Sequence, residues 1–499
     1  MTFIEYKSLT PAQRVVYKVK EFFSLLPGRL KAFFSAIGKF FANLGSSFVA
    51  GLKGYGSRFA SGDMGTKASY LIMGFGNFTR GQVGKGLVFL GVEIAYIVYM
   101  LNFGLYYLGL FDTLGTIQTH QEVSPTTGRP VMVPGHNSML ILLYGTMSIL
   151  ISIVFIAIYV ANTKAAFEAE QTHKAGKKNP TLKEELADFL DGKYHITLLS
   201  LPVLLISVFS ILPLTFMILI AFTNYDKTHV PPGNLFTWVG LDTFREVFKV
   251  TEGASKGYTF YALTKWTIIW AIFATFTNYI FGMIIALMIN KKSIKFKAFW
   301  RTLFVVTIAV PQFVSLLLMQ QILQDDGVLN VILGYMGIPA ISFFNSTALT
   351  ARITVIVINM WVGIPYTILS TSGILMNIPE DLYESARIDG ATPVVQFFQI
   401  TLPYMLFVTT PSLIQSFVGN INNFNVIYLL TGGGPNKDAN LYQAGQTDLL
   451  VTWLFKLTMD SSEYNLAAAV GILVFIVCAT LSLITFNLSK SSRNEEEFS

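Results

Sequence analysis

The stretch Ile196–Phe222 reads ITLLSLPVLLISVFSILPLTFMILIAF and contains no charged side chain. A helix needs about 20 apolar residues to cross the hydrocarbon core of a bilayer, so this stretch predicts a membrane span. Runs of similar length recur along the chain and predict eight spans, and hence an all-α, polytopic membrane protein. The predicted spans lie at about 87–111, 139–161, 196–222, 266–290, 302–324, 353–376, 404–430 and 466–489.

The composition excludes most soluble folds. Charged residues occupy 13% of the 499 positions, about half the usual share of roughly 25%, whereas hydrophobic residues occupy 53%. A soluble chain of this length could not cover so much apolar surface. The net charge of +6 does not indicate nucleic-acid binding, because the basic residues lie between apolar runs. The single cysteine, Cys478, excludes both a disulfide within the chain and a cysteine-based metal site.

The distribution of Lys and Arg predicts the orientation in the membrane. If both termini are cytoplasmic, the inside segments carry 26 of these residues and the outside segments carry 8, as the positive-inside rule requires. Basic and bulky apolar residues alternate in 15–23 and 31–34, which predicts interfacial helices on the inner leaflet. A loosely ordered basic tail is the alternative. No signal-peptide pattern is visible, so we expect the N-terminal segment to be retained.

These observations predict four parts. A cytoplasmic segment with interfacial helices covers 1–86, and two accessory spans with a cytoplasmic linker cover 87–195. A six-helix core covers 196–489 and includes a cytoplasmic loop at 377–403. A short cytoplasmic tail covers the last residues, 490–499.

The last six predicted spans contain no Asp, Glu, Lys, Arg or His, which argues against coupling to an ion gradient. The first span contains Glu93, for which we expect a neighbouring helix as partner or a position near the interface, with a functional role as the alternative. The chain has no G-x-x-x-x-G-K-[ST], H-E-x-x-H or G-x-S-x-G motif. We therefore expect no enzyme. Uphill transport would need energy from a separate polypeptide.

The loop at 377–403 carries the signals of two short helices. Pro379 suits a first helical position, and Gly390 can take the left-handed conformation that ends a helix. A second helix is expected to begin at Pro393 and to run to a break at Leu402–Pro403. Such a helix pair would project from the membrane surface.

The first of these helices has the side chains of a docking element. Ser385 and Ala386 are small enough for close approach to a partner, while Glu384, Arg387 and Asp389 could fix its orientation. An ordinary interfacial hairpin is the alternative.

The same loop resembles the EAA loop of bacterial ABC importer permeases, with the pattern E-A-A-x(3)-G-x(9)-I-x-L-P. Ser385 replaces only the first alanine of the pattern. The residues in register are Glu384, Ala386, Gly390, Ile400, Leu402 and Pro403. The resemblance implies that the loop, with Asp389, docks in a cleft of an ATP-binding subunit.

The same resemblance implies a set of partners. Two copies of an ABC ATPase subunit would bind ATP and Mg, so no cofactor is expected in this chain. A second, MalG-like permease subunit would complete a heterodimer, and an extracellular sugar-binding lipoprotein would deliver the substrate.

Amides in the seventh predicted span indicate a polar path. Gln415, Asn420 and Asn423 lie roughly on one side of a helix, and uncharged amides suit a ligand rich in hydroxyls. Tyr366 adds a face for a sugar ring. Gly363 and Pro365 are expected to interrupt helix hydrogen bonding, which is tolerated where the backbone lines a cavity. Hydrogen bonding between helices is the alternative role of these amides.

Residues 262–489 resemble the MalF-type permease subunits of maltose and maltodextrin importers. The resemblance places Gly363, Tyr366, Asn420 and Asn423 at sugar contacts. Gln312 replaces a serine of that family, which could widen the path for a longer oligosaccharide. The stretches that carry the resemblance are 361–366, 422–424, 429–435, 447–450 and 466–469.

The resemblance thus implies a permease for oligosaccharides, foremost maltose and maltodextrins, in a Gram-positive cytoplasmic membrane. Only about 43 residues, 223–265, follow the third span where Gram-negative members have a large periplasmic domain. A permease for galacto- or raffinose-type oligosaccharides is one alternative, and an ion-coupled sugar carrier is another.

Overall fold

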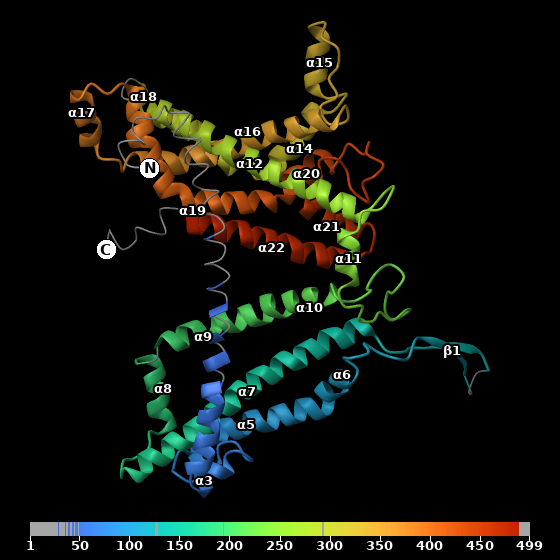
Figure 1. Cartoon of the computed structure of the whole chain (residues 1–499), viewed down its shortest axis with the longest axis vertical. Coiled ribbons are helices and arrows are strands. Elements are labelled where there is room, and N and C mark those ends of the chain that lie inside the picture. Colours follow the sequence, from blue (N-terminus) through green and yellow to red (C-terminus); the bar gives the residue numbers. More distant parts are fainter. Residues whose placement is uncertain are drawn as a thin grey trace. The chain divides into compact units, whose positions relative to one another are not determined.

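The computed structural model describes residues 28, 35, 38–39, 42–43, 45–47, 49–124, 128–192, 194–291 and 294–488. The segments 15–23 and 31–34, for which interfacial helices were predicted, and the tail 490–499 lie outside these residues. The chain forms two compact units (Figure 1), of which the first comprises Met1–Leu108 with Gly145–Ser210 and the second Gly109–Tyr144 with Ile211–Ser499. The chain passes between the units at three places, after Leu108, Tyr144 and Ser210, which lie in the first, second and third predicted spans.

Helices make up most of the described residues. The first part of the chain contains α3 (Met64–Ala68), α4 (Phe75–Phe78), α5 (Val83–Tyr99), the π turn η1 (Met100–Gly104), α6 (Leu105–Gly109), α7 (Ser138–Lys174), α8 (Leu182–Leu190) and α9 (Tyr194–Ile206). Then follow the π turn η2 (Ser207–Ile211), α10 (Leu212–Ile220), α11 (Asp242–Phe248), α12 (Lys256–Asn290), α13 (Lys297–Ala309), α14 (Gln312–Leu323), α15 (Val328–Tyr335) and α16 (Ala348–Leu375). The chain continues with α17 (Glu380–Ile388), α18 (Pro393–Gln396), the π turn η3 (Phe397–Thr401), α19 (Leu402–Ile421), α20 (Phe424–Thr431), α21 (Leu450–Met459) and α22 (Tyr464–Leu488).

A small antiparallel hairpin is the exception to the helical fold, and the sequence did not predict it. Strand β1 (His120–Val123) pairs with β2 (Pro130–Val133), and His120 lies opposite Val133. The hairpin lies in the connection between the first two predicted spans.

Seven helices of the described chain are long and apolar enough to cross a membrane. The predicted span at 302–324 is not a continuous helix, because α13 and the stretch Gln312–Tyr335, which contains α14 and α15, meet at an angle of 90°. Pro311 causes this break: the residue before a proline is pushed into an extended conformation, and Val310 has φ −79° and ψ 124°. If the bent pair counts as one span, the number of spans is the predicted eight.

A polar cluster around the buried side chain of Arg80 links helices of the first unit. The Arg80 guanidinium lies 2.5 Å from Asp63 and 3.6 Å from the buried Glu170 on α7. Burial alone would raise the pKa of Asp63, but its hydrogen bonds with Arg80 and with the backbone N–H of Thr66 outweigh burial and lower this pKa. Glu93 accepts a hydrogen bond of 2.8 Å from the backbone N–H of Met73, so this carboxylate in the span has a structural partner.

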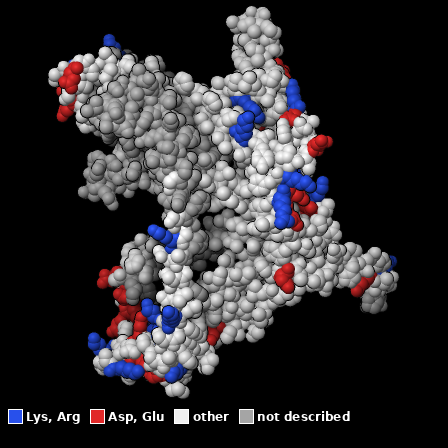
Figure 2. Space-filling view, in the orientation of Figure 1, with Lys and Arg blue, Asp and Glu red and all other residues white. Residues whose placement is uncertain are grey.

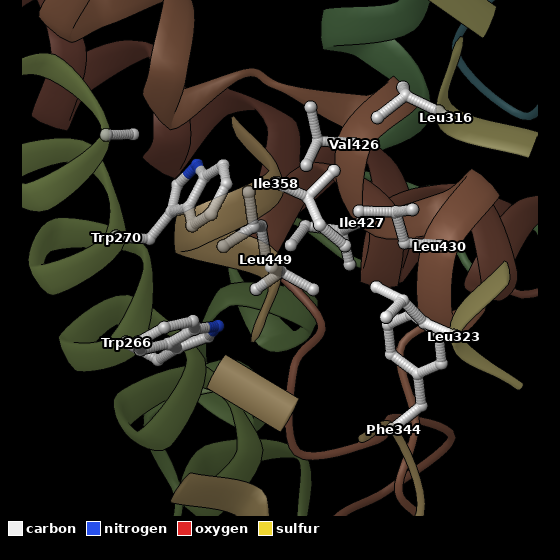
Figure 3. Close-up of a cluster of buried hydrophobic side chains, with 12 residues drawn as sticks. Trp266, Trp270, Leu316, Leu323, Phe344, Ile358, Val426, Ile427, Leu430 and Leu449 are labelled. Carbon is white, nitrogen blue, oxygen red and sulfur yellow. The ribbon is translucent and has the colours of Figure 1, made fainter. Parts of the chain in front are cut away.

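Buried apolar side chains of α12, α14, α16 and α20 form a core of the second unit (Figure 3). Trp266 and Trp270 of α12 are almost completely buried there. The indole N–H of Trp266 donates to the carbonyl of Thr447 at 3.1 Å, and that of Trp270 donates to the carbonyl of Asn420 at 3.0 Å. The second bond fixes the C-terminal end of α19 against α12, which matters for the cavity described next.

Candidate functional site

A cavity of about 550 Å³ lies within the second unit. Its walls come chiefly from α12, α16 and α19, with contributions from α14 and from the start of α20. The lining contains no Asp, Glu, Lys, Arg or His. Its polar members are Thr275, Asn278, Tyr279, Gln312, Tyr366, Thr367, Ser370, Thr409, Ser412, Ser416, Asn420, Asn422, Asn423 and Asn425.

The cavity brings together five of the six residues predicted for a sugar path. These five are Gln312, Gly363, Tyr366, Asn420 and Asn423. The sixth, Gln415, is exposed on α19 and does not belong to the lining. Residues five apart on an α-helix differ by about 140° around its axis, so Gln415 and Asn420 face different directions.

Asn420 and Asn423 form a connected pair of amides. The Asn423 amide N–H donates to the Asn420 side-chain oxygen at 3.3 Å, and the Asn420 amide N–H donates to the Thr275 hydroxyl at 3.0 Å. Asn420 therefore links α19 to α12. This hydrogen bond is of the kind expected if the amides join helices, which was the alternative to a sugar path. A carboxamide has two donor hydrogens and two acceptor lone pairs, so each of these amides retains capacity for a ligand.

The polar sequence around Asn422 and Asn423 also breaks the seventh span. Helix α19 ends at Ile421, and the Asn423 side chain accepts a hydrogen bond of 3.4 Å from the backbone N–H of Val426, which caps α20. Asn422 and Asn423, the two residues between these helices, both line the cavity.

Tyr366 and Gly363 come from α16, which is continuous from Ala348 to Leu375 although Pro365 lies within it. Pro365 removes one backbone N–H from the hydrogen bonding of α16, and the helix continues because its other bonds remain. Tyr366 is 51% exposed. It also lines a second cavity of about 220 Å³, together with Gln312 and Trp361.

The contribution of α12 was not predicted from the sequence. Thr275, Asn278 and Tyr279 line the cavity. Thr275 and Asn278 are three residues apart and so share a helix face. The signal for these cavity residues was their polar spacing inside an apolar run. Polar residues in a membrane span usually face other protein or water, not lipid.

The predicted helix pair at 377–403 is present. Gly390 has φ +77° and ends α17 in the left-handed conformation. The Gly390 N–H donates to the Arg387 carbonyl at 3.0 Å, and the Ala391 N–H donates to the Ala386 carbonyl at 2.8 Å. These two bonds satisfy carbonyls that the helix end would otherwise leave open.

The second helix begins as predicted but does not break where expected. Thr392 caps α18 with its side chain, and the chain then continues through the π turn η3 directly into α19. The predicted break at Leu402–Pro403 is wrong, because a wider turn before a proline can absorb its missing N–H without ending the helix. Ile400, Leu402 and Pro403 therefore lie on the helix that enters the membrane span.

The remaining loop residues gather on the exposed helix α17 and its terminal turn. Glu384, Ser385, Asp389 and Gly390 are exposed and Ala386 is half-buried. Figure 2 shows the acidic side chains as a red patch at the place of α17 in Figure 1. The hydroxyls of Tyr383 and Thr401 are hydrogen-bonded at 2.8 Å and tie α17 to η3.

A helical core with an uncharged polar cavity, and an exposed acidic helix tied to the helices of that cavity, defines a membrane transport subunit. A family model described as "Binding-protein-dependent transport system inner membrane component" matches residues 278–493. The chain belongs to this family of permeases, and it is a permease subunit of an ABC importer rather than an enzyme. The predicted fold class and the resemblance to sugar ABC-importer permeases are confirmed.

Two relatives from Bacillus subtilis (strain 168) align along most of the chain. The galactooligosaccharides transport system permease protein GanP is 36% identical and covers 85% of this chain and 97% of its own length. The maltodextrin transport system permease protein MdxF is 34% identical and covers 85% of this chain and 95% of its own length.

A solved bacterial alginate ABC transporter, in complex with a periplasmic protein bound to alginate pentasaccharide, shares the fold. Its matching chain has a TM-score of 0.50 and 21% identity. The match covers 61% of this chain and 96% of that chain.

Proposed function

We propose that this permease carries neutral oligosaccharides, foremost maltodextrins, through the cavity of its second unit. The observation that carries the proposal is the lining, in which amides and hydroxyls gather without a charged side chain. Such groups donate and accept hydrogen bonds with sugar hydroxyls and avoid the desolvation cost of a buried charge. Galactooligosaccharides are the second candidate, because GanP and MdxF are similarly close to this chain.

The proposed assembly follows from the family and from the exposed helix pair. A MalG-like permease subunit completes the pore, two copies of an ATPase bind ATP and Mg, and an extracellular sugar-binding lipoprotein delivers the sugar. Helix α17 docks on the ATPase, which places both chain termini in the cytoplasm, in agreement with the bias of Lys and Arg. Relatives from Bacillus and Streptococcus support a Gram-positive cytoplasmic membrane.

The proposed mechanism is alternating access. Closure of the ATPase pair moves α17, and the hydrogen-bonded link from Tyr383 to η3 passes this movement to α19. Because α19 carries Asn420 of the cavity wall, its displacement changes the contacts that the sugar can make. Coupling requires that the sugar and ATP each bind the two states with different affinity.

Substrate class is tested by uptake into vesicles that carry the complete complex with its own binding protein. Labelled maltotriose should accumulate, and unlabelled maltodextrins should compete more strongly than galactooligosaccharides or raffinose. An acidic oligosaccharide should compete poorly, since the cavity offers no cation to pair with it. Preferential competition by the acidic sugar would contradict the proposed function.

A further inference from the structure

Asn278 is a polar residue of the cavity wall that lacks a partner among the described residues. It lies on α12, and its side chain forms no hydrogen bond with any residue that the structure describes. The carboxamide oxygen is buried. Most buried side-chain polar atoms have a hydrogen-bond partner. An unpaired carboxamide in a cavity wall is therefore a candidate for hydrogen bonding to a ligand.

Gly363, on the facing helix α16, has a specific relation to this carboxamide. A Cβ atom at position 363 would overlap the Asn278 amide nitrogen and would lie 2.7 Å from its Cγ. The two helices also pack closely one turn further along, where a Cβ on Gly282 would lie 2.5 Å from the Cβ of Thr367. Since α12 and α16 are held together along their length, the carboxamide has room only because residue 363 has no side chain.

We propose that Asn278 is a sugar-recognition residue of the cavity and that Gly363 is the positioning residue that seats its carboxamide. This inference rests on the proposed function. A carboxamide both donates and accepts, and rotation of its terminal torsion presents either the oxygen or the nitrogen to a sugar hydroxyl. Through Asn278, helix α12 would contact the sugar, as α19 does through Asn420 and α16 through Tyr366.

The test is a double-mutant cycle in the complete complex, with Asn278→Ala, Gly363→Ala and the double variant. Asn278→Ala should raise the KM for sugar about tenfold with little change in kcat, as expected for the loss of hydrogen bonds to the ligand. Gly363→Ala should lower uptake at least tenfold, because its methyl group displaces the carboxamide. The double variant should match Asn278→Ala within twofold, since nothing is left to displace.

Three controls separate recognition from packing. Asn278→Leu keeps a similar side-chain shape but cannot form hydrogen bonds, so it should also raise the KM for sugar. If the complex with Asn278→Ala fails to assemble, Asn278→Leu tests sugar recognition in its place. The ratio of kcat/KM for maltotriose and a galactotriose should change at least threefold in these variants. Thr277→Ala, next to Asn278, removes a hydroxyl that bonds within α12 to the Phe273 carbonyl and should leave uptake unchanged.

The outcomes distinguish this inference from the proposed function. An unchanged KM and sugar ratio in both Asn278 variants, with normal wild-type uptake, overturns the inference alone. A double variant as defective as Gly363→Ala overturns the seating role of Gly363. A wild-type complex that transports none of the neutral sugars overturns the proposed function and the inference with it.

Discussion

Replacing Gly390 with valine should lower sugar uptake at least tenfold. The backbone at Gly390 has φ +77°, a conformation that costs a non-glycine residue about 1–2 kcal/mol and is a clear outlier for a β-branched one. The strain falls on the turn that ends α17, a helix of nine residues, which is too short to persist without its terminal bonds. The docking helix should therefore lose its orientation, and ATP hydrolysis should no longer drive uptake or the complex should fail to assemble.

The chain offers a matched control for this variant. Gly337 has φ +74° and, like Gly390, open space where a Cβ atom would lie, but it belongs to the turn after α15, away from α17. Gly337→Val should cause similar local strain and leave uptake near the wild-type level. Normal uptake and normal ATPase activity in Gly390→Val would count heavily against α17 as the coupling element.

The second large effect is expected at Tyr366 and Asn423. Tyr366→Ala removes a ring that is 51% exposed, so it should not leave a buried void in the core. Asn423→Ser removes the amide and retains an oxygen that can cap α20, which isolates ligand binding from helix stability. Each variant should raise the KM for sugar or lower kcat about tenfold while the complex remains assembled.

These two variants decide between a sugar path and simple bonding between helices. Tyr366→Phe should retain part of the activity if the ring stacks on the sugar and the hydroxyl adds one hydrogen bond. Tyr335→Ala is the control, because Tyr335 on α15 is 89% exposed and does not line the cavity. Wild-type kinetics in both Tyr366→Ala and Asn423→Ser would favour the interhelical role.

The sequence predicted the membrane spans and the turn at Gly390 because both depend on local chemistry. An apolar run long enough for a bilayer has few alternatives to a spanning helix, and Gly390 and Thr392 act through their own backbone conformation and capping bonds. The bend at Pro311 and the π turn before Pro403 were not predicted, because a proline in a membrane helix can cause either a sharp break or a local adjustment. Which of the two occurs depends on the packing of neighbouring helices.

The site was predicted incompletely for a related reason. Spacing along the predicted seventh span identifies Asn420 and Asn423 as neighbours, but the face that points into the cavity is set by tertiary contacts such as the bond from Trp270 to the Asn420 carbonyl. The sequence therefore pointed to Gln415, which does not line the cavity, and not to Asn278, which does. The close approach of Asn278 to Gly363 joins residues far apart in the sequence, and no local pattern reveals it.

The central claim is that sugar crosses an uncharged path and that the energy arrives from ATP through α17. It is tested most directly by accumulation of labelled maltotriose in proteoliposomes that hold the complete complex and its binding protein. We predict accumulation only when ATP and Mg are present on the side of α17, and no inhibition by ionophores. Accumulation without ATP, driven by an imposed sodium or proton gradient and abolished by ionophores, would contradict this claim.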